Sequence, residues 1–399
     1  MAILADLLIA IGVVGLLGST LGSSWAAWVL SFFSSHRISA TVDNPTIISY
    51  IPSLDILIPA HNEEGQIGRT LGSIVNSRDL FVTHQRHLHN VQAKIKIVIG
   101  VDHCTDHTEQ VIREFTQSRR VEGLTIQKNL KTPGKWVIVQ QLIKQSQAEW
   151  VALVDSGTVW EEWLLENALP LFFNKDVIGV SPSYRPLAVG ILERFYWAIE
   201  RFLKQIESRA GGPTSVHGPT VFYRREALLA ALEELSSKNW LNDDVVIPLT
   251  LRTLFPKQKI EYLSRKNGRA WILDHGIKQN LSIEYNRRKR MLIGNLQWIR
   301  ILFWKSFKSS IKVGLIASRR VFRTFWAYWI TLLFLGIFLH ALNYAPLAST
   351  LVAALSIAAL ALYPLQGTLS KSRAAFRAGL QIPFHWNKAR KKTPGDIWN

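Results

Sequence analysis

The chain has 399 residues, which exceeds one average domain, and 48% of them are hydrophobic, with 15 Trp. No nucleic-acid motif accompanies its formal net charge of +18. Much of the excess charge lies beside apolar segments, which favours anionic lipid head groups over nucleic acid as the partner. The only cysteine, Cys104, excludes an internal disulfide, as is typical of a reducing compartment.

The first apolar segment, Leu7–Phe33, contains no charged residue and is long enough to cross a bilayer. A cleaved signal peptide is the alternative, but such a peptide begins with a basic region. Met1–Leu21 has no Lys or Arg. We therefore expect a retained transmembrane helix within residues 1–36.

Three short apolar runs in the region 45–275 each end on a polar cluster. The runs and clusters, in order, are Leu54–Pro59 with His61–Glu64, Ile95–Val101 with Asp102–Asp106, and Trp150–Val154 with Asp155–Thr158. Apolar runs of this length that alternate with helical stretches predict buried parallel strands. Ligands of open α/β sheets bind at the carboxyl ends of such strands. The acidic residues there predict a ligand with a ribose and phosphates, together with a metal ion.

Three further motifs complete the series, of which the first lies between the second and third runs and the other two follow the third run. Lys135 ends Thr132–Lys135, Asp243 and Asp244 precede a short apolar stretch, and Arg287–Met291 is strongly basic. The six motifs together resemble family-2 glycosyltransferases over roughly residues 50–300. The resemblance is to the membrane-embedded branch with chitin, hyaluronan and cellulose synthases and ceramide glucosyltransferase. It implies an α/β fold of the GT-A type, Rossmann-like in its first half.

The resemblance also implies roles for the donor site. Asp102 would bind the nucleoside, and Asp155 would hold Mg²⁺ or Mn²⁺, the cations that oxygen ligands favour. Lys135 and Arg290 would face the diphosphate. The remaining residues that we assign to substrate binding are Pro59, His61, Glu63 and Arg287.

The same resemblance makes Asp244 the general base for the acceptor hydroxyl, with Asp243 beside it, which implies inversion at the anomeric carbon. The chain departs from common family forms at Gly157, Asp243 and Met291, where relatives have Asp, Glu and Trp. Simpler interpretations stay open. Asp155 could cap a helix, Asp243 and Asp244 could stabilise a helix N-terminus, and the cluster Arg287–Arg290 could be membrane-surface charge. We expect Asp106 to cap the helix that follows it or to fix the turn before that helix.

A basic region, 276–320, follows the α/β domain. Within it, residues 297–316 alternate aromatic and cationic side chains, which predicts either a helix in the membrane interface or one packed on the domain. We expect two transmembrane helices in 321–363, at Val321–Leu342 and Leu347–Leu362, and a basic tail at 364–399. The flanking cations place the domain and the tail in the cytoplasm, at a plasma or inner membrane.

The sequence thus predicts an inverting enzyme that moves a sugar from a nucleotide donor, expected to be UDP-linked, to a membrane lipid or a growing glycan. Synthesis of an extracellular or capsular polysaccharide is favoured. Addition of a single sugar to a ceramide-like lipid is the alternative, because three spans are few for a private channel. An oligomer or a partner subunit could supply the export path. A catalytically degenerate scaffold subunit is the third interpretation.

Overall fold

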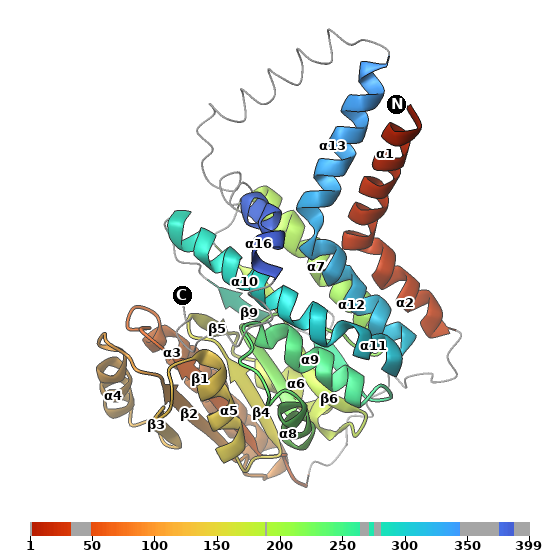
Figure 1. Cartoon of the computed structure of the whole chain (residues 1–399). Helices are drawn as coiled ribbons and strands as arrows, with labels where there is room; N and C mark the ends of the chain where they lie inside the picture. The colour runs from red at the N-terminus through yellow and green to blue at the C-terminus, as the bar shows by residue number, and fades with distance from the viewer. Residues whose placement is uncertain are drawn as a thin grey trace.

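The computed structural model describes residues 2–32, 49–187, 190–263, 271–274, 281–343 and 375–386. An α/β domain forms the lower part of the molecule in Figure 1, and a layer of helices covers one side of it. Two helices, near the N-terminus and at residues 326–342, project from that layer as a pair.

The first half of the α/β domain is Rossmann-like, as predicted. Strands β1 (Leu54–Ala60), β2 (Ile95–Val101), β3 (Leu124–Lys128) and β4 (Trp150–Val154) are parallel, in the spatial order β3-β2-β1-β4. Helices α3 (Ile67–His89), α4 (Thr108–Arg119) and α5 (Lys135–Gln145) connect them. β1 and β4 are buried along their whole length, which explains their continuous apolar sequence.

The second half makes the sheet mixed. β7 (Thr220–Arg224) pairs antiparallel with both β4 and β6 (Val177–Pro186). β8 (Lys259–Leu263) and β9 (Trp271–Asp274) run parallel to β6, and β5 (Thr158–Trp160) runs antiparallel to β9. The helices of this half are α6 (Leu164–Phe173), α7 (Ile191–Arg209), α8 (Arg225–Glu234) and α9 (Asp243–Leu254). The predicted α/β fold is confirmed.

The stretch 297–316 is not one helix. It comprises the end of α10 (Leu281–Ile301), then α11 (Phe303–Ser309) and the start of α12 (Ile311–Thr324). Trp298 and Leu302 are buried in the same core as α5, α8 and α9, whereas Trp304 is 68% exposed. Trp298 and Leu302 therefore fit the second interpretation, a helix packed on the domain, whereas lipid contact by the exposed residues of this stretch stays a prediction.

One described helical stretch, Ala2–Thr20, is long and apolar enough to cross a membrane. It comprises α1 (Ala2–Leu17) and the start of a π-helical turn at Gly18–Gly22; α2 (Ser23–Phe32) follows. The predicted span Val321–Leu342 is interrupted at Phe325: α12 and α13 (Trp326–Leu342) meet at a 64° bend and meet the same criterion only as a bent pair. The 17 residues of α13 extend about 26 Å, less than a typical hydrocarbon core of about 30 Å. The predicted third span, 347–362, lies outside the described residues.

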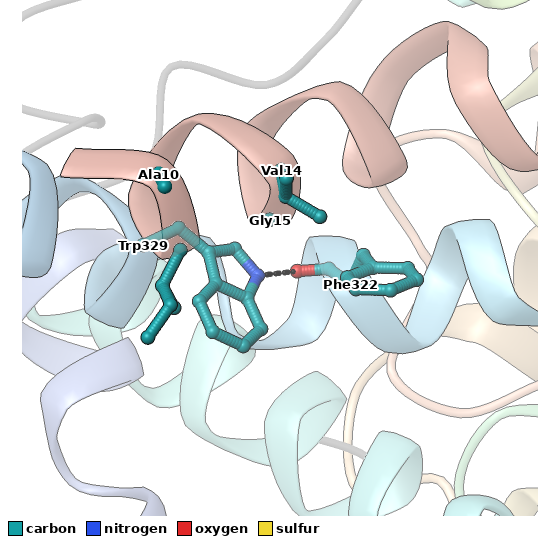
Figure 2. Close-up of a pocket in the computed structure, with 6 residues that line it drawn as sticks. Ala10, Val14, Gly15, Phe322 and Trp329 are labelled. Carbon is teal, nitrogen blue, oxygen red and sulfur yellow. Dashed lines mark hydrogen bonds between the residues drawn. The ribbon is translucent and has the colours of Figure 1, made fainter. Parts of the chain in front are cut away.

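α1 and α13 pack closely because small residues line their contact. A Cβ on Gly12 would lie 2.8 Å from the backbone nitrogen of Leu333, and one on Gly336 would lie 2.8 Å from the carbonyl oxygen of Ala5. Close approach through small residues is the usual way helices associate in lipid. Figure 2 shows the indole of Trp329 in an apolar pocket beside α1, where its Nε1 donates a 2.8 Å hydrogen bond to the carbonyl of Phe322. The Phe322 carbonyl group lies close to the bend, where regular helical hydrogen bonding is interrupted, and the indole provides it with a hydrogen-bond donor.

Candidate active site

The acidic clusters that follow β1, β2 and β4 meet at one edge of the sheet, as predicted. The three strands are neighbours and parallel, so their carboxyl ends are adjacent. The backbone NH of Asp102 donates to the carbonyl of Ala60 at 2.9 Å, and the NH of Asp155 donates to the carbonyl of Pro219 at 3.0 Å. The loop 215–219, which precedes β7, therefore closes the site on a side that the sequence did not indicate.

Lys135 lies at the centre of the site. It is the first residue of α5, and its Nζ lies 2.7 Å from Asp155 Oδ1 and 3.1 Å from Asp243 Oδ2. Burial lowers the pKa of the Lys135 ammonium, but the two carboxylates outweigh this effect and raise it above its ordinary value. Burial raises the pKa of the Asp155 carboxyl, against the opposing influence of Lys135. Asp155 and Asp243, which are distant in the sequence, thus both contact the ammonium group of Lys135.

Asp102 positions the loop that carries Lys135. Its side chain is fully buried, and its Oδ2 accepts a 2.7 Å hydrogen bond from the backbone NH of Gly134. Its Oδ1 accepts a bond from Asn129 Nδ2 at 2.5 Å and lies 3.0 Å from His103 Nδ1. Contact between Asp102 and a nucleoside stays a prediction, whereas its support of the loop before α5 is observed.

The cluster after β1 is bonded to the cluster after β2. His61 Nδ1 lies 2.6 Å from the carbonyl oxygen of Asp102. The NH of Glu63 donates to Thr108 Oγ1 at 2.6 Å, and burial raises the pKa of the Glu63 carboxyl. Asp106 Oδ1 accepts from the NH of Thr108 at 3.0 Å, so Asp106 fixes the turn before α4. The N-cap residue of α4 is His107, which makes no side-chain capping bond. The carbonyl of Pro59 accepts a 3.4 Å bond from Ser156 Oγ, which ties the first cluster to the third.

Asp243 and Asp244 are the first two residues of α9, so the helix N-terminus that the sequence allowed is present. Their side chains nevertheless face cations from other elements. Asp243 contacts Lys135, and Asp244 Oδ2 lies 3.6 Å from a guanidinium nitrogen of Arg320 on α12. Burial raises the pKa of the Asp244 carboxyl, and Arg320 offsets part of this rise. A carboxyl group with a raised pKa at such a site is suited to accept a proton.

α10 brings Arg290 to the same cluster. The half-buried guanidinium of Arg290 interacts electrostatically with Asp243, Asp155 and Asp244. Arg287, almost one turn earlier on α10, is exposed. Gly294 allows α10 to approach α9, because a Cβ there would lie 2.5 Å from Asn242 Oδ1. The fold therefore brings the predicted Arg290 to the carboxylates.

An Asp at position 157, where relatives have a second carboxylate, would be strained in this backbone. The φ of Gly157, +87°, lies in the left-handed region, and a Cβ would lie 2.5 Å from Gln66 Oε1. Among the described residues, no group of three or more His, Cys, Asp or Glu side chains is arranged to hold a metal. The oxygen ligands available beside Lys135 come from Asp155 and Asp243. Mg²⁺ is often bound by one or two carboxylates plus substrate phosphates, so this set fits a cation that binds together with a phosphorylated substrate.

Sequence reasoning missed two contributors to the site. Arg320 belongs to a basic stretch that we assigned to lipid head groups, yet it contacts Asp244. Gly218 lies between the carboxylates, since a Cβ there would lie 3.5 Å from Asp244 Cβ and 3.6 Å from Asp155 Oδ2. Its neighbour His217 is buried among aromatic rings, and burial lowers its pKa to about 3. His217 is thus neutral and is not a candidate acid or base.

The site thus consists of carboxylates and cations at the carboxyl ends of the parallel strands of a mixed α/β sheet. The family model described as glycosyltransferase like family 2 matches residues 52–265, more than half of the chain. The chain therefore belongs to this family and is a glycosyltransferase. α10 and α12, which supply Arg290 and Arg320, lie outside the matched segment.

Solved structures agree on the fold. The mannosyltransferase PcManGT from Pyrobaculum calidifontis, in complex with GDP-Man and Mn²⁺, has a TM-score of 0.65 and 18% identity, with 96% of this chain and 99% of that chain covered. Glucosyl-3-phosphoglycerate synthase from Mycobacterium tuberculosis, with Mn²⁺, UDP and phosphoglyceric acid, has a TM-score of 0.39 and 15% identity over 60% and 76% of the two chains. The second likeness is too loose to support an argument. No curated protein sequence matches the chain.

Proposed function

We propose that the enzyme transfers a sugar from a nucleotide-sugar donor to a hydroxyl group of a membrane-associated acceptor, with inversion at the anomeric carbon. The observation that carries this proposal is the ammonium of Lys135 between Asp155 and Asp243, with Asp244 alongside. The structure of PcManGT in complex with GDP-Man supports a donor of this class. UDP is the expected nucleotide from the sequence, and GDP is the second candidate.

Lys135 and Arg290 bind the donor diphosphate in this proposal. Both side chains face the carboxylate cluster from helices on different sides of it, and a guanidinium donates to phosphate oxygens in a planar fork. Asp155 holds Mg²⁺ or Mn²⁺, with Asp243 close enough to contribute. The bound cation offsets the negative charge that grows on the diphosphate as it leaves.

Asp244 accepts the proton of the acceptor hydroxyl. The acceptor oxygen forms a bond to the anomeric carbon as the bond from that carbon to the diphosphate oxygen breaks, and the electron pair leaves with the diphosphate. A single displacement needs one base and gives inversion. Arg320 and Gly218 lie next to this carboxylate, so α12 and the loop 215–219 border the acceptor side.

The first test uses purified full-length protein with a panel of UDP- and GDP-sugars, Mg²⁺ or Mn²⁺ and native lipid. Release of nucleoside diphosphate with one sugar, lost in Asp155→Ala and Asp244→Asn, is the expected result. Asp79→Asn is the matched control, because Asp79 is an exposed carboxylate paired with Arg78. Unchanged release or complementation by Asp244→Asn would instead favour a degenerate scaffold subunit.

Two acceptor classes are separable by product size. We favour polysaccharide synthesis from the sequence motifs. Transfer of one sugar to a lipid is the second candidate, because the described residues provide one candidate span, or two if the bent pair α12–α13 counts as one. A ladder of product lengths would support the polysaccharide version, and a single product would support lipid transfer.

A further inference from the structure

Helix α7 buries charged residues beside Leu203 and Ile206 on its inner face and exposes apolar residues on its outer face. Glu200, Lys204 and Glu207 face the protein interior and are 8%, 2% and 1% exposed. Ile191, Phe195 and Phe202 face outward and are 83%, 66% and 49% exposed. Ala198, also exposed, completes the spacing of four, three and four residues that places them along one stripe of a helix. We call these four residues the α7 stripe.

The charged inner face prevents α7 from rotating its stripe into the core. Arg319 of α12 donates from Nε to Glu207 Oε1 at 2.7 Å and from its terminal nitrogen to Glu200 Oε1 at 3.0 Å. Lys204 Nζ lies 3.1 Å from Glu207 Oε2 and donates to Ser215 Oγ at 2.9 Å. Turning the helix would leave these buried charges without partners, which is costly. The outward direction of the stripe is thus built into the fold.

The surroundings of the stripe indicate what covers it. α7 packs beside α2, and it lies in the helix layer near the foot of the α1–α13 pair (Figure 1). α2 exposes Val29 and Phe32, and α1 exposes apolar residues along its length. Exposed apolar residues are thus present on α7, on α2 beside it, and on the helix that is long enough to span a membrane. A water-facing helix would expose its charged face instead.

We infer that the α7 stripe is inserted in the interfacial layer of a lipid bilayer, parallel to its surface. Exposed Arg209 lies on the same helix and supplies charge that is complementary to anionic head groups. The inference rests on the membrane location in the proposed function but not on its chemistry. It places the membrane contact on α7, whereas the sequence had suggested residues 297–316.

Seating α7 in lipid also positions the active site. Arg319 holds α12 on the inner face of α7, and its neighbour Arg320 contacts Asp244. The depth of α7 in the bilayer therefore sets the height of the acceptor side above the lipid.

The test places a fluorophore on the stripe of the full-length protein. In a Cys104→Ser background, which removes the only cysteine, Phe195→Cys is labelled with a polarity-sensitive dye in vesicles of phosphatidylcholine and phosphatidylglycerol. Leu88→Cys is the matched control, because Leu88 is exposed on α3 of the α/β domain. We expect a blue-shifted emission and quenching by nitroxide-labelled lipids at position 195 and neither effect at position 88. This readout needs no activity, so it can fail independently of the proposed function.

Two outcomes would overturn the inference. Emission at position 195 that matches position 88 would show a water-exposed stripe. A blue shift without lipid quenching, accompanied by energy transfer between labelled copies that rises with protein-to-lipid ratio, would show that a second copy of the chain covers it. A second variant, Phe195→Glu with Phe202→Glu, should reduce transfer to a membrane acceptor while donor hydrolysis to water is retained. Equal transfer to the membrane acceptor would also count against lipid contact.

Discussion

Replacing Arg320 with Gln should move the acidic limb of the pH–rate profile to higher pH. Burial raises the pKa of Asp244, and the guanidinium of Arg320, 3.6 Å away, opposes that rise. Without Arg320 the carboxyl is protonated over a wider range of pH. A protonated carboxyl group is no base, so activity is lost at a higher pH as the solution is acidified.

The size of the shift follows from the contact. Two unit charges about 4 Å apart interact by about 4 kcal/mol at an effective dielectric constant of 20. The two side chains are 19% and 25% exposed, and water screening reduces this value to roughly 1–2 kcal/mol. Because about 1.4 kcal/mol corresponds to one pKa unit, we expect the limb to rise by about one pH unit.

The assay is transfer by full-length protein in vesicles across the pH range at saturating donor. Activity of Arg320→Gln should approach that of the unaltered protein at high pH and fall below it near neutrality. Arg323→Gln is the matched control, since Arg323 lies one turn away on α12 and contacts Glu200 instead of Asp244. An unchanged limb in Arg320→Gln, or an equal shift in both variants, would refute the assignment.

Other substitutions probe the donor site and the buried charges. Lys135→Ala should raise the KM for the donor at least tenfold, measured by steady-state kinetics, because it removes one of the cations that face the diphosphate. Gly157→Asp should not strengthen Mn²⁺ binding in a titration and should lower stability by about 1–3 kcal/mol, because φ is +87° there; G157A tests the strain alone. Arg319→Met should destabilise the fold by about 1.5–3 kcal/mol in thermal unfolding, since it removes buried charge-assisted hydrogen bonds to Glu200 and Glu207, which keep Arg323 and Lys204 as partners. Arg323→Gln should cost less than about 1 kcal/mol. Chelation should abolish transfer, and added Mg²⁺ or Mn²⁺ should restore it.

The sequence alone determined the parts of the fold that depend on local patterns. Apolar, β-branched runs become buried parallel strands, so β1, β2 and β4 and the polar ends of each were predictable. The ordered motifs also identified the family and selected Asp155, Asp243, Asp244, Lys135 and Arg290, which the fold brings together. Asp155 follows strand β4, whereas the other four residues begin or lie on helices. All five belong to motifs that occur in a fixed order along the chain.

Only the tertiary structure decided which charges serve the site and which serve the fold. Arg319 and Arg320 are adjacent and read alike as membrane-flanking cations, yet a helix points neighbouring side chains about 100° apart. One is therefore buried against Glu200 and Glu207, and the other reaches Asp244. The outward apolar stripe of α7 was also invisible to periodicity, because an amphipathic pattern gives the faces of a helix without saying which face meets the protein. That choice depends on partners more than a hundred residues away in the chain, which no local pattern encodes.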